Sequence, residues 1–448
     1  MSFDEIAGFA LGPCDVPEAA LDYAATLLLD TLGVAAGAAP MQAGRLARAH
    51  VRRFHPAGAD ADAATLIFDG ARVSLPGAIF AAATQIDNLD AHDGYNPTKG
   101  HIGCAVVPAL CAFAEHLPDL SARDALVALS MSYELSARAA IALHASVSDY
   151  HTSGAWNALG VAALGARLRG AGPEVLRHAL GIAEYHGPRS QMMREIANPT
   201  MLHDGSGMGG LVGAMALLLA EDGFTGAPAI TVEGAEAAPH WADLGQRWTI
   251  TDNYIKPYPI CRWAHAAIDA LGALMDAHGL AAADIATIDV RTFAQSAALF
   301  AGLPETTSQA QYSLGFALAV RAVHGAIGPT HIGGDGLQDA AVAEVLGRIT
   351  VTEDARHSAR FPLGRWSDVT LRLVDGRVLH SGDVHARGGP EAPMALAEVE
   401  AKFHLMANPL PAARRAALWQ MRRQLLRSDL PFADFLALVH PAVEVRYG

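Results

Sequence analysis

The run Leu27-Leu28-Leu29-Asp30-Thr31-Leu32-Gly33-Val34 decides the fold class of this chain. It belongs to a segment, 16–36, that opens with Pro17 and Glu18 and places apolar residues at helical spacing, ending near Gly37. Further Ala- and Leu-rich segments of the same kind follow: Leu75–Ile86, Val106–His116, Ala122–His144, Ala155–Arg169, Pro173–Tyr185 and Gly209–Glu221. The pattern predicts a mainly α protein whose first part, up to residue 266, is one all-helical domain.

The pattern of the sequence changes after residue 266. Four segments are β-branched or alternate in polarity and are predicted to be strands: Ala286–Phe293, Ile349–Thr352, Ser367–Val374 and Arg377–Val384. The last two flank Asp375-Gly376, a strong hairpin signal. Two helical patterns, Gln311–His324 and Asp339–Arg348, lie between the strands. We therefore expect a smaller α+β domain over 267–395.

Helical patterns return after Pro393, at Leu396–Met406 and Ala412–Leu426. We assign them to the helical domain, which is then built from residues 1–266 and 396–448. A chain of 448 residues exceeds one ordinary hydrophobic core, so two domains are the default expectation.

Composition limits the classes of function. Apolar residues make up 51% of the chain and charged residues 17%, which indicates a large dry interior and a surface compatible with an oligomer. The net charge of −14 argues against nucleic acid as a partner. No membrane partner is expected, because the longest apolar run, Leu211–Ala220, is about half a bilayer span. Four cysteines without a CxxC pair, and an N-terminus without a basic-then-apolar leader, predict a cytoplasmic protein.

Only three of the basic residues are lysines, Lys99, Lys256 and Lys402, against twenty-nine arginines. A lysine is a compact point charge whose pKa falls on burial, a property that arginine cannot match. Lys99 and Lys256 are therefore candidates for a functional role and Lys402 is a weaker one; chance placement is the alternative.

The densest polar cluster follows the helix predicted over 75–86. Its members are Asp87, Asp90, His92, Asp93, Lys99 and His101, in a loop rich in Gly, Pro and Asn. Carboxylates and imidazoles together suit proton transfer near neutral pH. They also suit a divalent metal, but the charge of Lys99 opposes a bound cation, so no metal is assigned. A loop that is merely solvated by its acids is the remaining alternative.

A second candidate, Asp149-Tyr150-His151-Thr152-Ser153-Gly154, directly precedes the helix predicted over 155–169. Thr152 or Ser153 is placed to cap that helix, whose N-terminus offers N–H groups to a carboxylate. His151 would then act as a general acid or base beside the bound anion, or it is simply part of the cap.

A third segment, His203-Asp204-Gly205-Ser206-Gly207-Met208-Gly209-Gly210, contains a literal G-x-G-x-x-G. No strand pattern precedes it and no βαβ unit follows, so a dinucleotide site is not expected. The glycines are better explained by the close approach of a helix N-terminus to a ligand or to a neighbouring helix.

A fourth segment, Lys256-Pro257-Tyr258-Pro259-Ile260-Cys261-Arg262-Trp263-Ala264-His265, lies where the composition changes. Its two prolines exclude a helix and stiffen the loop. A rigid loop that carries Lys, Arg, Tyr and His is suited to line a cleft for a polyanion, or it serves only as a hinge. Cys261 has no evident relay of base and acid, so it is not proposed as a nucleophile.

These segments, in this order, resemble the MmgE/PrpD family, which includes 2-methylcitrate dehydratase, cis-aconitate decarboxylase and iminodisuccinate epimerase. The resemblance spans nearly the whole chain and depends on the ordered set of motifs. The motifs are Leu27–Gly33, the acidic loop that ends at His101-Ile102-Gly103, Tyr133-Glu134 with Arg138, His151–Gly154, Gly223–Gly226, Lys256–Pro259 with Cys261 and His265, Tyr312-Ser313, and Lys402-Phe403.

The resemblance implies a helical domain formed by both chain ends, an inserted α+β lid, and a homodimer with a cofactor-free active site between the domains. It also implies a small polycarboxylate substrate. Matched motif by motif, the catalytic groups are Asp93, His101, His151 and Lys256. The substrate-binding candidates are Lys99, Tyr150, Arg189, Arg194, His203, Tyr258 and Arg262.

Two departures from the family pattern bear on the reaction. First, the dehydratase and decarboxylase branches carry a Lys a few residues before their glycine-containing motif, and this chain has Thr200 at that place. Second, this chain has Ile102-Gly103 where those branches have the Gly-Pro or Ser-Pro of their His-Pro-Gly loop. By contrast, Tyr185–Arg194 and Asp204–Gly207 look more like the epimerase branch. Losing the Lys at position 200 removes one carboxylate partner, which fits a dicarboxylate ligand.

All three activities handle a carbanion next to a carboxylate, so the site must stabilise developing negative charge. His101 and His151 start close to the pKa that a base needs, whereas the pKa of Asp93 would have to be raised by burial. Epimerisation of the iminodisuccinate type is the first expectation, and a lyase of the dehydratase or decarboxylase type is the alternative. A metal-dependent hydrolase that uses the 87–101 cluster and a relative that binds without catalysis are remoter alternatives.

Overall fold

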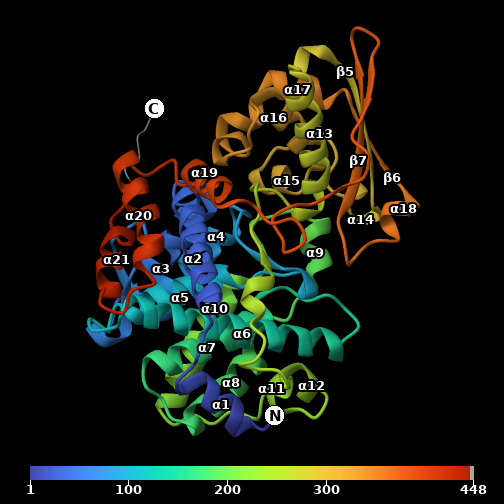
Figure 1. Cartoon of the computed structure of the whole chain (residues 1–448). Coiled ribbons are helices and arrows are strands. Elements are labelled where there is room, and N and C mark those ends of the chain that lie inside the picture. The colour runs from blue at the N-terminus through green and yellow to red at the C-terminus, as the bar shows by residue number, and fades with distance from the viewer. Residues whose placement is uncertain (444–448) are drawn as a thin grey trace. The chain divides into compact units, whose positions relative to one another are not determined.

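The computed structural model describes residues 1–443 of the chain. The described residues are mainly helical, as predicted, and divide into two compact units (Figure 1). Among the described residues, the first unit contains 1–192, 202–253 and 399–443, and the second contains 193–201 and 254–398. The predicted domain limits stay a prediction, because compact units in a structure do not show that each part folds alone.

Long apolar helices form the core of the first unit (Figure 1). They are α2 (Glu18–Ala38), α4 (Leu75–Asp87), α5 (Gly103–Ala114), α6 (Ala122–Ser146), α7 (Gly154–Leu168), α8 (Pro173–His186) and α10 (Ser206–Glu221). Helix α10 packs against α4, α7 and α8, and α6 packs against α7. Each corresponds to a predicted helix, although α10 begins at Ser206 and not at Gly209.

The close packing of α10 depends on the glycines of the third sequence segment. A Cβ on Gly209 would lie 2.5 Å from the carbonyl oxygen of Gly154 in α7. A Cβ on Gly207 would lie 2.1 Å from Oγ1 of Thr84 in α4. The prediction that these glycines allow a close approach between helices is confirmed.

Shorter elements complete the first unit. They are α1 (Phe3–Leu11), α3 (Gln42–Phe54), the antiparallel pair β1 (Ala63–Thr65) and β2 (Arg72–Ser74), α11 (Ile230–Glu233), α12 (Ala238–Trp241), α20 (Ala412–Gln424) and α21 (Phe432–Val439). Helix α19 (Leu396–Met406) belongs to this unit from Val399 onward. Of these shorter helices, the sequence patterns predicted α19 and α20, and they did not predict α1, α3, α11, α12 or α21.

Two helices of this unit, α2 and α6, are long and apolar enough to cross a membrane. Of the apolar window of each, 83% and 89% respectively is buried inside the protein. Both helices are therefore mostly packed against other parts of the protein.

The second unit contains a sheet with the strand order β6-β5-β7-β8, and β9 also pairs with β7. The strands are β5 (Ile285–Thr292), β6 (Ile349–Glu353), β7 (Trp366–Leu373), β8 (Val378–His380) and β9 (Val384–His385). Strands β5 and β6 are parallel, and the other pairs are antiparallel. Helix α13 (His265–His278) packs against β7 and against α16 (Leu314–His324), which in turn contacts α17 (Ala340–Leu346) (Figure 1).

Four short helices, α9 (Met192–Ala197), α14 (Ala294–Ala297), α15 (Thr307–Gln311) and α18 (Ala355–Ser358), lie between or before these elements. The predicted hairpin at Asp375-Gly376 is confirmed, since Arg372 of β7 is paired with Val378 of β8. The single strand predicted over 377–384 is wrong: β8 ends at His380, and Gly382, with φ of +68°, breaks the chain before β9. The helix predicted from 311 begins at Leu314, because the Ser313 hydroxyl caps it.

Candidate functional site

The polar residues that follow α4 form a buried network within the first unit. Asp87, Asp90, His92, Asp93 and His101 are each more than nine-tenths buried. Asp90 and Lys99 both have φ of +52°, in the left-handed region, which lets the chain turn sharply twice within this segment. The alternative of a loop that is merely solvated by its acids is therefore wrong.

Two carboxyl groups of this loop lie at helix N-termini. The amide of Ser206, at the start of α10, donates to Oδ2 of Asp87 at 3.0 Å. The carboxyl group of Asp93 lies at the start of α5, where a Cβ on Gly103 would be only 2.2 Å from Oδ1. Position 103 therefore requires glycine. The free N–H groups of a helix start favour negative charge beside them, so they oppose the effect of burial on both carboxyl groups.

Burial raises the pKa of Asp93 to about 6, against the opposing charge of His101 and with a further rise from Asp30. The hydroxyl of Thr31 donates to Oδ1 of Asp93 at 3.4 Å. A carboxyl group that titrates near pH 6 can exchange a proton under nearly neutral conditions. Burial therefore supplies the rise in pKa that a catalytic role of Asp93 requires.

The ring of His101 is oriented by the backbone of the same loop. Its Nδ1 lies 2.6 Å from the carbonyl oxygen of Asp93. Because a carbonyl only accepts, Nδ1 carries the proton and Nε2 is the basic nitrogen of the neutral ring. Nε2 lies 3.6 Å from Oδ2 of Asp204. The imidazole is thus held between two of the segments that the sequence singled out.

Ser153 connects His101 to the other two segments of the first unit. Its hydroxyl accepts from the His101 amide at 2.9 Å and donates to Oδ1 of Asp204 at 2.7 Å. The amide of Gly154 donates to the Asp204 carbonyl at 2.8 Å. Ser153 occupies the N-cap position of α7, but no side chain caps the helix, so the predicted capping by Thr152 or Ser153 is wrong.

A second group surrounds His92, whose ring centroid lies 4.4 Å from that of His101. Nε2 of His92 is 3.6 Å from Oδ1 of Asp87, and Sγ of Cys104 lies 3.1 Å from the Ser206 hydroxyl. Burial, followed by the charge of Asp204, raises the pKa of Asp87 well above its usual value. Two sets of possible ligand atoms each lie within 4.8 Å of one another: Asp87, His92 and Cys104, and Asp90, His92 and His101.

His151 lies in an extended segment that is held from one side by residues 190–192. The Thr152 amide donates to the Ser190 carbonyl, and the Met192 amide donates to the Tyr150 carbonyl, both at 2.8 Å. His151 is 7% exposed, and its Nε2 lies 3.4 Å from Oδ1 of Asp149. The imidazole is therefore buried beside a carboxylate.

Lys99 and Tyr150 contact each other. Nζ of Lys99 lies 4.7 Å from the centroid of the Tyr150 ring, and the Tyr150 hydroxyl donates to the Lys99 carbonyl. The pKa of His144 is lowered to about 4, mainly by burial. The hydrogen bond to the Ala140 carbonyl raises this pKa in part, and the charges of Lys99 and His151 lower it further. Lys99 and His151 thus act on the same imidazole.

Two more substrate-binding candidates belong to the first unit. His203 is buried in the turn before α10, where Asp204 and Gly205 both have positive φ. Arg189 is exposed. The first unit therefore brings Asp93 and His101 into contact, links His101 to the His151 segment through Ser153, and leaves Arg189 at the surface.

The second unit carries Lys256, which is 1% exposed. The neighbouring amide of Ile255 donates to the Gly388 carbonyl at 3.0 Å and fixes this segment. The Tyr258 hydroxyl donates to Asp269 at 2.8 Å. Burial, followed by the charges of Lys256 and Arg262, lowers the pKa of His265 well below its usual value. His265 is therefore neutral beside the buried lysine.

Arg262 and Arg194 differ in their surroundings. The guanidinium of Arg262 donates to the carbonyls of Ala386 and Arg387 and lies 3.7 Å from the centroid of the Tyr254 ring. Burial lowers the pKa of Arg262 to about 10. Arg194, on α9, is exposed. Internal contacts thus already hold Arg262, whereas Arg194 is exposed.

Sequence reasoning did not assign roles to several residues of the network. Ser153 and Asp204 lie in segments that were singled out, but their link to His101 has no local signal. Nζ of Lys402 donates to Oδ2 of Asp30 and to the carbonyl of Ala91, each at 2.7 Å. The rarity of lysine was the only sequence signal for this contact.

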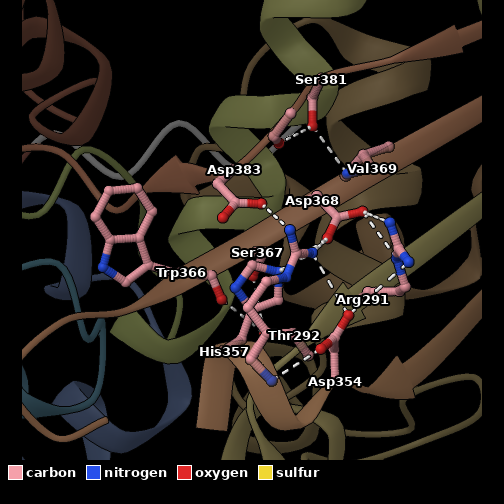
Figure 2. Close-up of polar contacts among 12 residues, drawn as sticks. Arg291, Thr292, Asp354, His357, Trp366, Ser367, Asp368, Val369, Ser381 and Asp383 are labelled. Atoms are coloured by element: carbon pink, nitrogen blue, oxygen red, sulfur yellow. Dashed lines mark hydrogen bonds and ion pairs between the residues drawn. The ribbon is translucent and has the colours of Figure 1, made fainter. Parts of the chain in front are cut away.

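The second unit has a further cluster of charged side chains on β5, β7 and α18, which Figure 2 shows. Asp354, His357 and Asp368 have possible ligand atoms within 4.8 Å of one another. Asp368, however, accepts from Arg291 at 3.0 Å, and it also accepts from Arg356 and His357. Arginines already neutralise this carboxylate, so we interpret the cluster as a structural ion-pair network.

Comparison with protein families gives two matches. The model of the MmgE/PrpD N-terminal domain matches residues 6–246, and that of the MmgE/PrpD C-terminal domain matches residues 258–425. A search of the curated proteins finds no match. The two matched ranges include every catalytic and substrate-binding candidate except Lys256, which lies between them.

Proposed function

Since the chain belongs to the MmgE/PrpD family, whose members are generally isomerases or lyases, we propose that it moves a proton at a carbon next to a carboxylate. The substrate is a small di- or tricarboxylate, and the reaction is most like that of iminodisuccinate epimerase, with no cofactor. Two observations on neighbouring groups carry the proposal: Asp93 is a buried carboxyl group with a pKa of about 6, and the main-chain carbonyl of Asp93 fixes the tautomer of His101.

The proposed chemistry starts with removal of the Cα proton by one of these groups. The electron pair left on carbon spreads into the adjacent carboxylate, where a nearby cation stabilises the added negative charge. Lys256 is the proposed cation, because it is a point charge on a stiff segment. An epimerase then returns a proton on the opposite face of the carbon, so groups on two sides are needed. Asp93 with His101, and His151, are the proposed pair.

The carboxylates of the substrate need partners of their own. Lys99, Arg189, Arg194 and Arg262 are the proposed cations, with Tyr150, Tyr258 and His203 as hydrogen-bonding groups. The exposed guanidinium groups of Arg189 and Arg194 are more available than that of Arg262. Thr200 in place of a lysine favours a dicarboxylate over a tricarboxylate ligand.

Several features remain part of the proposal. We propose that the second unit acts as a lid over the first, and that the active site forms between them. We also propose that the protein is a cytoplasmic homodimer. A lyase of the 2-methylcitrate dehydratase or cis-aconitate decarboxylase type is the alternative reaction.

A metal-dependent hydrolase is the second candidate, because the loop after α4 offers two sets of closely spaced His, Asp and Cys atoms. One fact weighs against it. The raised pKa of Asp87 favours a protonated carboxyl group, which is a poor ligand. Elemental analysis of purified protein tests it: a stoichiometric metal would favour the hydrolase.

Proton NMR in D₂O with iminodisuccinate, 2-methylcitrate and cis-aconitate in turn tests the proposal. We expect the Cα–H signal of iminodisuccinate to disappear without net loss of compound. A new vinyl signal would indicate the lyase alternative instead. No change with any of the three would contradict the proposal and favour a relative that binds without catalysis.

Two variants test the assigned residues in the same assay. We expect His151→Ala and Lys256→Ala each to lower turnover by roughly a hundredfold without unfolding the protein. His178→Ala is the matched control for His151, since it removes a half-buried imidazole that contacts the backbone of Gly226. Near-wild-type rates in His151→Ala or Lys256→Ala would refute that residue's assignment.

A further inference from the structure

His151 is held by its backbone as well as by its ring. Its amide N–H donates to Nε2 of His144, in the last turn of α6, at 3.2 Å. Its neighbours Tyr150 and Thr152 are bonded to residues 192 and 190 on the opposite side. The segment is therefore fixed from two directions, once by a side chain and once by main chain.

The two hydrogen bonds of His144 determine its tautomer. Nε2 accepts a backbone N–H, so it must present a lone pair. Nδ1 lies 3.0 Å from the carbonyl of Ala140, so it must carry the proton. The low pKa of about 4, caused mainly by burial, keeps this ring neutral at physiological pH. A protonated His144 would lose the bond to the His151 amide.

The ring of His151 has two different surroundings. Nε2 faces the carboxylate of Asp149 at 3.4 Å, and a carboxylate favours an N–H pointed at it. Nδ1 is buried and has no hydrogen-bond partner among residues 1–443. A buried imidazole nitrogen without a partner is costly unless something else uses it. Lys99, Asp149 and His144 are the charged or titratable groups that act here.

We propose that His144 and Asp149 are positioning residues that together present Nδ1 of His151 as one of the proton-accepting atoms of the site. Asp149 holds the N–H on Nε2, and His144 holds the backbone so that the ring cannot turn away. This inference rests on the proposed function for what Nδ1 does, but the tautomer and the backbone bond exist without substrate.

The tautomer of His151 is the first test. Protein labelled with ¹⁵N in its histidine rings is compared with His151→Gln protein at pH 7.5, and the signals lost in the variant are those of His151. We expect an N–H on Nε2 and a bare Nδ1, and a mixture of tautomers in Asp149→Asn. A proton on Nδ1 in the wild type would overturn the proposal.

Kinetics provide the second test. We expect His144→Leu to lower kcat about tenfold with KM changed less than twofold, because the ring of His151 is misplaced while the substrate carboxylates stay bound. His144→Gln should recover kcat to within about threefold, since its side-chain carbonyl can accept the His151 amide. Asp149→Asn, at a half-exposed position, should lower kcat about fivefold.

The matched control is His178→Leu. His178 also accepts a backbone N–H, from Gly226 at 3.2 Å, but it lies outside the predicted site. We expect this variant to keep the wild-type kcat. Equal kcat in His144→Leu, Asp149→Asn and the wild type would overturn the proposal, as would equal losses in His144→Leu and His178→Leu. Wild-type protein with the expected tautomer but no activity would contradict the proposed function alone and support the positioning.

Discussion

The loop after α4 and the cluster around Asp368 each bring three carboxyl groups close to histidine, two histidines in the loop and one in the cluster. The pKa values of their carboxyl groups, however, are shifted in opposite directions. In the cluster, arginines pair with the carboxylates (Figure 2), and the pKa of Asp354 is lowered by the amide and then by the charge of Arg356. In the loop, burial raises the pKa values of Asp87 and Asp93.

The difference separates structural acids from acids suited to chemistry. A carboxylate paired with arginine stays ionised and cannot exchange a proton at neutral pH. A buried carboxyl group without a paired arginine titrates near the pH at which enzymes work, at the expense of stability. The comparison therefore points to the loop, and not to the cluster, as the place of proton transfer.

The largest expected effect on stability comes from removing one cation beside the loop after α4, compared with removing one from the cluster around Asp368. Lys402→Met leaves the carboxyl group of Asp30 buried without its partner, so we expect the free energy of unfolding to fall by about 3–5 kcal/mol. Arg291→Met removes a half-exposed partner of Asp368, which keeps two others, so we expect the free energy of unfolding to fall by no more than about 1 kcal/mol. Urea unfolding measures both.

The double variant Asp30→Leu with Lys402→Met is the control for that experiment. We expect it to recover most of the loss, because neither charge is then buried alone. Equal losses in Lys402→Met and Arg291→Met would break the comparison at its first step.

Glu134, on α6, tests whether a buried carboxyl group with a raised pKa makes the protein less stable as pH rises. It accepts from Thr249 and from the Ile250 amide, yet burial raises its pKa to about 7. The folded protein thus binds this proton more tightly than the unfolded chain does. Its contribution to the free energy of unfolding falls as pH rises from about 4.5 through 7.

The side chain of Gln cannot ionise. We therefore expect the free energy of unfolding of Glu134→Gln, relative to that of the wild type, to rise by about 2–3 kcal/mol when the pH is raised from 4.5 to 8. Asp354 should behave in the opposite sense, because its folded pKa is lowered. Asp354→Asn should be destabilised at neutral pH, and the difference should vanish as pH falls. Denaturant unfolding at both pH values tests this. A stability difference from the wild type that changes with pH in the same direction for both variants would contradict the account.

The smallest effects come from two buried threonines. Thr292→Val removes a 2.8 Å bond to Ser367 in the cluster and should cost about 1 kcal/mol without changing turnover. Thr31→Val removes a weaker donor to Asp93 in the loop. We expect a similar small loss of stability, but also a rise in the pKa of Asp93. The fall in rate on the acid side should then begin at a higher pH, which a pH–rate profile would show.

Most of the core helices could be predicted from the sequence, because an apolar stripe is a local signal. Helix α3 was not predicted, because its buried face carries mostly small residues and Arg48 in place of large apolar side chains. The polar segments were also recognised locally, including the glycines that let α10 approach α7. The contacts between segments were not, because Lys402 meets a partner 372 residues away and Ser153 meets one 51 residues away. Such contacts depend on tertiary packing, which no local pattern encodes.

The most direct measurement is the rate of deuterium incorporation at the Cα of iminodisuccinate in D₂O, compared between wild type, Asp93→Asn and Asp354→Asn. The account predicts rapid exchange in the wild type and in Asp354→Asn, and a loss of roughly a hundredfold in Asp93→Asn. In the wild type, the rate should fall below a pH of about 6, because Asp93 must lose its proton to act as a base. Unchanged exchange in Asp93→Asn, or an equal loss in Asp354→Asn, would contradict the account.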